Sequence, residues 1–214
     1  MNAESHAERM DDVYRGQKHI YDASRKFFLL GRDRLIRELQ PDTSATVLEL
    51  GCGTGRNLLH VGRRYPTTQL YGVDISMEML GLAQKSLYRG GCEANLARAD
   101  ASCFDPQELF GRANFDRVFV SYALSMIPPW KRTIAHALQL LAPGGSLHIV
   151  DFGQQEHLPD LARKGLFSWL RRFHVTPHET LFDIVQEKAR AHGAIATCQP
   201  LYRGYAWHAV VQMS

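Results

Sequence analysis

The stretch Val47-Leu48-Glu49-Leu50-Gly51-Cys52-Gly53-Thr54-Gly55 joins a short apolar run, carrying one acid, to three glycines at alternate positions. The run predicts a strand over 46–50, and the residues after it predict a helix over 57–64. Glycine lets a ligand approach the backbone closely, and the free N–H groups of a helix N-terminus attract it. The segment therefore predicts a ligand-binding strand–loop–helix unit. A glycine-rich turn without a ligand is the simpler alternative.

A second acid, Asp74, ends the next predicted strand, Gln69–Asp74, about twenty residues further on. A carboxylate there can accept from both hydroxyls of a ribose, so the two segments together predict a nucleoside-containing cofactor. Glu49 can receive the amino group of an amino-acid tail. The glycine spacing is not the G-x-G-x-x-G of dinucleotide-binding folds. Asp74 could instead only cap the helix that begins near Met77.

The pattern Glu-x-Gly-x-Gly-x-Gly resembles motif I of class I S-adenosylmethionine-dependent methyltransferases. The resemblance implies S-adenosyl-L-methionine as cofactor and an α/β fold, a Rossmann-like sheet of seven strands, mostly parallel with an antiparallel edge strand. It implies cofactor contacts at the strand ends, from Glu49, Gly51, Gly53, Gly55, Asp74, Ile75, Asp100, Ala101 and Ser121. Asp100 would accept from the adenine amine, or be an ordinary loop acid. Tyr122 would face the substrate, or simply pack in the core.

Alternating patterns along the chain predict the sheet directly. Strands are expected over 46–50, 69–74, 94–99, 116–121, 146–151, 194–200 and 205–213, and helices over 57–64, 77–90, 130–141 and 179–193. Ala142-Pro143-Gly144-Gly145 predicts a turn before the fifth strand. We expect one domain over 1–214, with a helical cap over 1–40, a cofactor-binding core over 46–151, an insertion over 154–178, and a helix and strand pair over 179–214.

Composition narrows the class of protein. The chain has 214 residues and a formal charge of +3, too small to indicate nucleic acid binding by itself. Its four cysteines form no C-x-x-C pair, and no histidine cluster has metal-ligand spacing, so we expect no metal site and a reducing cytoplasm. No apolar run has the length of a membrane span, and Met1 is followed by polar residues rather than a signal core.

The arm over 14–33, YRGQKHIYDASRKFFLLGRD, resembles the opening of the betaine-lipid methyltransferases known as BtaB, with Phe27 and Phe28 where tyrosines are common. That resemblance implies trimethylation of the homoserine amine of diacylglyceryl homoserine. Helical spacing places Tyr14, Tyr21 and Arg25 on one face, as candidate substrate-binding residues. Arginine suits a carboxylate and aromatic faces suit a quaternary ammonium. The alternative is an amphipathic helix that covers the core edge with its polar tips exposed.

The stretch over 163–173 mixes basic residues with large apolar ones, a composition typical of a helix at an anionic membrane surface. We therefore expect a lipid substrate and a cytoplasmic, peripherally membrane-associated protein. A buried insertion helix with solvated charges is the alternative. Methylation of phosphatidylethanolamine or another amine, and a catalytically silent cofactor-binding partner, are the other functional hypotheses. A nucleic-acid methyltransferase is disfavoured because Ser121-Tyr122-Ala123-Leu124 lacks the Asn/Asp-Pro-Pro-Tyr loop. No general base and no oligomeric state follow from the sequence.

Overall fold

A computed structural model describes residues 29–172 and 175–214. Tyr14, Tyr21 and Arg25 lie outside the described residues, so their predicted role stays a prediction. The elements are α2 (Arg32–Glu38), β1 (Thr46–Leu50), α3 (Arg56–Arg64), β2 (Gln69–Asp74), α4 (Met77–Arg89), β3 (Asn95–Arg98), α5 (Pro106–Phe110), β4 (Phe115–Ser121), the 3₁₀ helix η1 (Leu124–Met126), α6 (Trp130–Gln139), β5 (Leu141–Phe152), α7 (Asp160–Arg172), α8 (Leu181–Ala191), β6 (Ile195–Leu201) and β7 (Ala206–Gln212).

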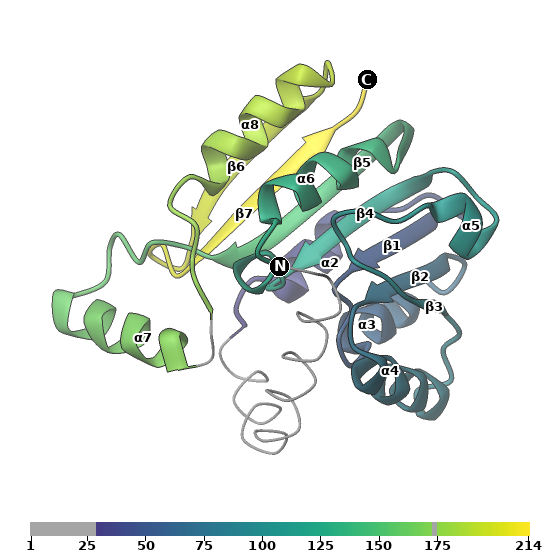
Figure 1. Cartoon of the computed structure of the whole chain (residues 1–214), viewed down its shortest axis with the longest axis horizontal. Coiled ribbons are helices and arrows are strands. Elements are labelled where there is room, and N and C mark those ends of the chain that lie inside the picture. Colours follow the sequence, from purple (N-terminus) through teal and green to yellow (C-terminus); the bar gives the residue numbers. More distant parts are fainter. Residues whose placement is uncertain (1–28, 173–174) are drawn as a thin grey trace.

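The strands form one seven-stranded sheet in the order β3-β2-β1-β4-β5-β7-β6 (Figure 1). The first five strands are parallel, and β7 runs antiparallel to both β5 and β6. This arrangement confirms the predicted methyltransferase-type sheet. Because β1 lies between β2 and β4, the carboxyl ends of these strands open at one edge, where ligands of such sheets bind.

Helices cover both faces of the sheet. One apolar cluster joins the strands to α6 and α8, through Ile134 and Val185 among others. The other joins them to α2, α3 and α4, through Leu35, Leu58 and Leu80. All five residues of β1 are buried, which explains why its sequence is a continuous run rather than an alternation of apolar and polar residues.

Two local features differ from the sequence prediction. The predicted turn at 142–145 lies within β5, because Leu141 already pairs with Phe115 before a register shift leads to the pair Ser146–Arg117. The Pro-Gly-Gly sequence thus forms an irregularity in a strand and does not precede one. The short helix α5 was not predicted, although Asp105 caps it by accepting from Gln107 N at 2.8 Å and a proline occupies its first turn.

The predicted insertion over 154–178 contains α7, which Figure 1 shows set apart from the other helices at the left of the view. Leu170 of α7 is buried in the second apolar cluster together with Val175, whereas Leu161 is 86% exposed. The helix is therefore attached to the body near its C-terminal end. Within residues 29–172 and 175–214, no helix has both the length and the apolar character needed to cross a membrane.

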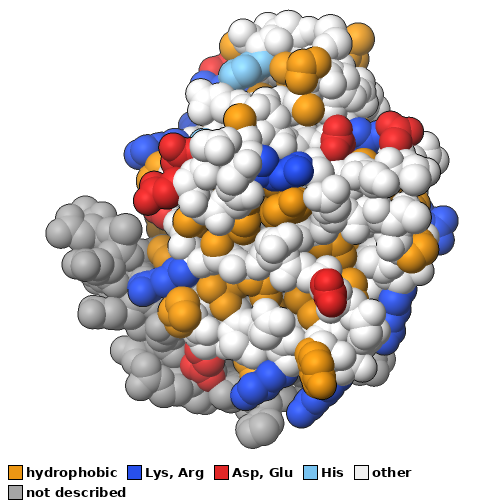
Figure 2. All heavy atoms as spheres, turned by 90° about the vertical axis from the view of Figure 1, so that its right-hand side faces the viewer, with side chains coloured by type: hydrophobic (Ala, Val, Ile, Leu, Met, Phe, Trp, Pro, Cys, Tyr) orange, Lys and Arg blue, Asp and Glu red, His pale blue; other side chains and the backbone are white. Residues whose placement is uncertain are grey.

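The face seen in Figure 2 carries Lys and Arg side chains interspersed with Asp and Glu, and hydrophobic side chains show between them. Neither sign of charge dominates this face. It therefore offers no continuous basic surface of the kind that binds a nucleic acid backbone.

Candidate functional site

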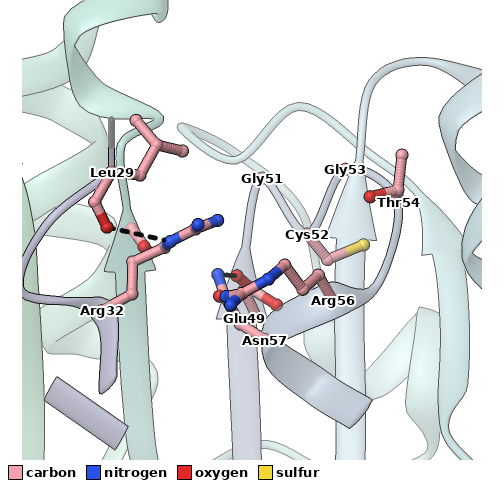
Figure 3. A pocket seen from close by; sticks show the side chains of 10 residues that line it. Leu29, Arg32, Glu49, Gly51, Cys52, Gly53, Thr54, Arg56 and Asn57 are labelled. Atoms are coloured by element: carbon pink, nitrogen blue, oxygen red, sulfur yellow. Dashed lines mark hydrogen bonds between the residues drawn. The ribbon is translucent and has the colours of Figure 1, made fainter. Parts of the chain in front are cut away.

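A cavity of about 230 Å³ opens at the carboxyl ends of β1 and β4 (Figure 3). Three segments surround it: the start of α2, the loop over 51–55 and the first turn of α3. Its lining residues are Leu29, Arg32, Glu49, Gly51, Cys52, Gly53, Thr54, Arg56, Asn57 and Ser121. The sequence prediction named Glu49, Gly51, Gly53 and Ser121, and the structure brings these four together.

The glycine loop is tied to β2 by its own backbone. Gly51 N and Cys52 N both donate to Val73 O, at 2.9 and 3.0 Å, and Gly53 N donates to Asp74 Oδ2 at 2.8 Å. Gly53 has φ +52° and Gly55 has φ +72°. A Cβ on Gly55 would lie 3.0 Å from the Cβ of Ala83 in α4. Glycine is therefore required at these two positions, for conformation at both and for helix packing at the second.

Asp74 fixes the loop and does not cap the next helix. Its Oδ1 accepts from Ser76 N at 3.0 Å, and the N-cap of α4 is Ser76, whose hydroxyl accepts from Met79 N at 3.3 Å. The capping alternative for Asp74 is therefore wrong. Each carboxylate oxygen has two lone pairs, so Asp74 can still accept from ribose hydroxyls while it holds these backbone groups.

Glu49 places a carboxylate at the floor of the cavity. The residue is 1% exposed, and its Oε1 accepts from Asn57 Nδ2 at 2.7 Å. Figure 3 shows the guanidinium groups of Arg32 and Arg56 extending toward it from opposite sides. A buried carboxylate requires positive charge or hydrogen-bond donors around it, and Asn57 with the two arginines supplies them.

The third strand end is more distant from this cavity. Asp100 Oδ1 accepts from Ser102 N at 2.8 Å, Ala101 is buried in the first apolar cluster, and the carbonyl of Ile75 accepts from Arg98 Nε at 3.1 Å. None of the three lines the cavity. Their proposed contacts with the cofactor stay predictions. Ser121 does line it, and its hydroxyl is buried without a hydrogen-bond partner among the described residues.

Tyr122 packs inside the fold. It is 2% exposed, its ring meets Phe152 edge-on at 4.6 Å, and its hydroxyl donates to Leu30 O. Burial raises the pKa of this phenol well above its usual value. The backbone at Tyr122 is left-handed, with φ +55°, so the extended conformation of β4 ends before this residue. These contacts favour the packing alternative over the expected contact with substrate.

Several lining residues were missed by sequence reasoning, above all Arg32, Arg56 and Asn57. Arg32 is 7% exposed and its Nε donates to Leu29 O at 3.1 Å. Cys52 also lines the cavity. It is buried, and burial, followed by the charge of Asp74, raises the pKa of its thiol. No local signal marked Arg56 as a lining residue, because an arginine in a sequence is most often exposed.

No cluster of three or more His, Cys, Asp or Glu side chains suitable for a metal ion occurs in the described part of the chain. The site consists of a glycine loop, the buried carboxylate of Glu49, the half-buried carboxylate of Asp74 that holds the loop, and two guanidinium groups. Such a set fits a nucleoside that carries an amino-acid tail.

Comparison with known proteins agrees with this chemistry. Residues 47–145 match a family described as a methyltransferase domain. A demethylmenaquinone methyltransferase of Porphyromonas gingivalis is 26% identical over 145 residues, covering 65% of this chain and 58% of that protein. A trans-aconitate 2-methyltransferase of Azoarcus sp. is 32% identical over 118 residues, covering 55% and 43%. The chain thus spans about half the length of these curated relatives.

Among solved structures, a phosphoethanolamine N-methyltransferase 2 of Haemonchus contortus, in complex with phosphomonomethylethanolamine and S-adenosylhomocysteine, has a TM-score of 0.67. It is 16% identical, and the match covers 86% of this chain and 52% of that one. At this identity the likeness concerns the fold. Together with the family match, it identifies residues 47–145 as a methyltransferase domain with the class I fold.

Proposed function

We propose that this chain is an S-adenosylmethionine-dependent N-methyltransferase that trimethylates the homoserine amine of diacylglyceryl homoserine. One observation carries the proposal beyond the methyltransferase domain. Leu29 and Arg32, the end of the arm that resembles BtaB, line the same cavity as Glu49 and the glycine loop. The end of the arm therefore lies where the cofactor would bind. A segment that binds the substrate amine has to lie close to that place.

The residues present fit the cofactor. The glycine loop allows close approach of the backbone, Glu49 suits the ammonium of the tail, and Asp74 suits the ribose. When bound, the cofactor supplies a methyl group on a sulfonium, which an amine takes by in-line displacement, forming an N–C bond as the S–C bond breaks. The protein has to orient a neutral amine toward that methyl and exclude water, which lowers the pKa of an ammonium and frees its lone pair.

A second cavity, of about 820 Å³, supports a lipid substrate. It lies between α7 and the segments over 154–156 and 175–179, and its lining includes Phe167, Val175, Arg163 and Arg171. Apolar side chains beside guanidinium groups suit the boundary between acyl chains and head groups. The solved N-methyltransferase described above gives separate support for an amine substrate.

The proposal is tested by incubating the protein with methyl-labelled cofactor and a panel of lipids, followed by mass identification of the products. We expect the trimethylated homoserine lipid. Products from phosphatidylethanolamine alone would favour the alternative amine substrate. Cofactor binding without any methyl transfer, from any lipid or small amine tested, would favour a silent cofactor-binding partner.

Variants of the arm test whether Tyr21 and Arg25 bind the head group of the substrate. Tyr21→Ala should lower turnover of the lipid by about tenfold, because it removes a ring face for the cationic amine. Tyr21→Phe keeps that face and should be much less affected. Arg25→Lys keeps the charge but loses the planar fork for the carboxylate, so it should raise the KM for lipid. Normal turnover in Tyr21→Ala and Arg25→Lys would contradict this role, as would melting losses that parallel the activity losses.

The basic end of α7 provides a prediction about membranes. Arg171→Glu should reduce sedimentation with vesicles containing anionic lipid by about fivefold or more, since each basic side chain near the surface contributes about 1 kcal/mol. Arg89→Glu is the matched control, because Arg89 is also exposed in the last turn of a helix, α4. Equal sedimentation of wild type and Arg171→Glu, or indifference to lipid charge, would show that α7 is ordinary surface.

A further inference from the structure

One wall of the cavity is formed by the short segment over 29–32, which leads into α2. Leu29 and Arg32 line the cavity, whereas Leu30 and Gly31, which lie between them, do not. Residues 29–31 form a turn and not a helix or strand, so a regular ladder of hydrogen bonds does not hold them. The place of the Arg32 guanidinium seen in Figure 3 therefore depends on contacts between this segment and other parts of the fold.

The first of these contacts comes from Tyr122, which follows Ser121 at the end of β4. Its hydroxyl donates to Leu30 O. The residue is 2% exposed, and its ring packs edge-on against Phe152. Its φ of +55° costs free energy in a residue other than glycine and persists only where the surroundings hold it. Because burial raises the pKa of the phenol well above its usual value, the hydroxyl keeps its proton and stays a donor to the segment.

Two further contacts transmit this anchoring to the cavity. Gly31 has φ +90°, and a Cβ there would lie 3.1 Å from Val150 Cγ2 in β5, so the segment packs closely against the sheet. Arg32 Nε donates to Leu29 O at 3.1 Å, which ties the guanidinium to the segment itself. A displacement of Leu30 would therefore move both residues of the segment that line the cavity.

We propose that Tyr122 is a positioning residue whose hydroxyl fixes the 29–32 segment as a wall of the cofactor cavity before a ligand binds. The proposal rests on the S-adenosylmethionine site proposed above, and it concerns a residue that does not line that site. A wall that is already ordered removes the entropy cost of ordering it on binding. Without the hydroxyl the fold persists, but the ligand has to order the segment as it binds, so its affinity falls.

The test compares two buried tyrosines by calorimetry with S-adenosylhomocysteine, well below the melting temperature. Tyr122→Phe removes only the hydroxyl and should weaken binding about fivefold, the change that corresponds to one hydrogen bond. Tyr71→Phe is the matched control, because Tyr71 is 6% exposed, its hydroxyl lies 3.2 Å from Gln69 Oε1, and its ring packs edge-on against Phe115, all outside the cavity. Any loss of stability in this control should leave the affinity normal, since nearly all molecules are folded at that temperature.

Two further variants identify the route by which Tyr122 acts. Gly31→Ala keeps the hydroxyl but displaces the same segment through its added Cβ, and it should weaken binding at least as much. Arg32→Gln removes the group that the segment positions, so in that background Tyr122→Phe should weaken binding less than twofold. A full fivefold loss there would overturn this route and show an effect through the neighbouring Ser121.

Melting temperatures without ligand show whether each variant is folded. Normal affinity in folded Tyr122→Phe, or in folded Gly31→Ala, would overturn the positioning role and leave the cofactor site standing. Failure of wild type to bind S-adenosylhomocysteine would overturn the positioning role and the cofactor site together.

Discussion

Replacing Gly53 with valine should lower the affinity for S-adenosylhomocysteine by about 100-fold or more, because the side chain fills the space through which a ligand reaches the backbone. Gly53 lines the cavity, and its N–H is held by Asp74 at 2.8 Å. Its φ of +52° adds a second effect, since a β-branched residue is strained there. The variant should therefore also unfold at a lower temperature than wild type.

A matched variant separates the two effects. Gly91 has φ +65°, and a Cβ there would meet no atom within 4 Å. Gly91→Val thus introduces similar backbone strain outside the cavity. We expect it to lower the melting temperature while the affinity stays normal, measured by calorimetry with S-adenosylhomocysteine. Affinity near that of wild type in folded Gly53→Val would remove the cofactor from this loop.

The sheet could be predicted from the sequence because its strands are short apolar runs separated by strong turn and helix signals. The bounds of β1 and β2 agree with the prediction to the residue. β5 was predicted too short because Pro143, Gly144 and Gly145 are typical of turns. Pairing of Leu141 with Phe115 keeps these residues in the strand, and such pairing between distant segments leaves no local signal.

The acidic and glycine positions of the cavity could be predicted because their spacing is set by local backbone requirements. Arg32 and Arg56 could not, because an arginine in a sequence is most often exposed. Arg32 is 7% exposed and Arg56 Nη1 is buried where α2 meets the first turn of α3, a contact between separate segments that leaves no local signal. Tyr122 shows the converse case, in which packing is the reading that the structure favours. Its place after β4 predicted contact with substrate, whereas tertiary packing against Phe152 and Leu30 uses the side chain within the fold.

The second large effect concerns stability in acid and arises from buried histidine. His148 of β5 is 3% exposed, and its Nε2 lies 2.9 Å from Ser146 Oγ. Burial, with smaller contributions from His208 and Arg117, lowers the pKa of His148 to about 3. The pKa of His208 is also lowered, by burial and to a lesser extent by the charge of Arg34, while Glu38, 3.5 Å from its Nδ1, raises it. Both imidazoles are therefore neutral in the folded protein.

The direction of the pH effect follows from the two states. The unfolded chain takes up a proton at His148 below its ordinary pKa of about 6.5, whereas the folded chain does so only near the lowered pKa, so stability falls as pH decreases through this range. Between about pH 6.5 and about pH 4.5 the loss from His148 alone should be about 2 kcal/mol. Urea unfolding at both pH values measures it.

His148→Gln should reduce that loss, because the amide can still bond to Ser146 but does not titrate. The quantity to compare is the difference in the free energy of unfolding between the two pH values, because repacking around the new side chain changes that free energy equally at both. His157→Gln, a change at an exposed histidine, is the control and should lose as much stability in acid as wild type. If His148→Gln and wild type lose equal stability between the two pH values, the neutral imidazole in the core does not limit the acid stability of this fold.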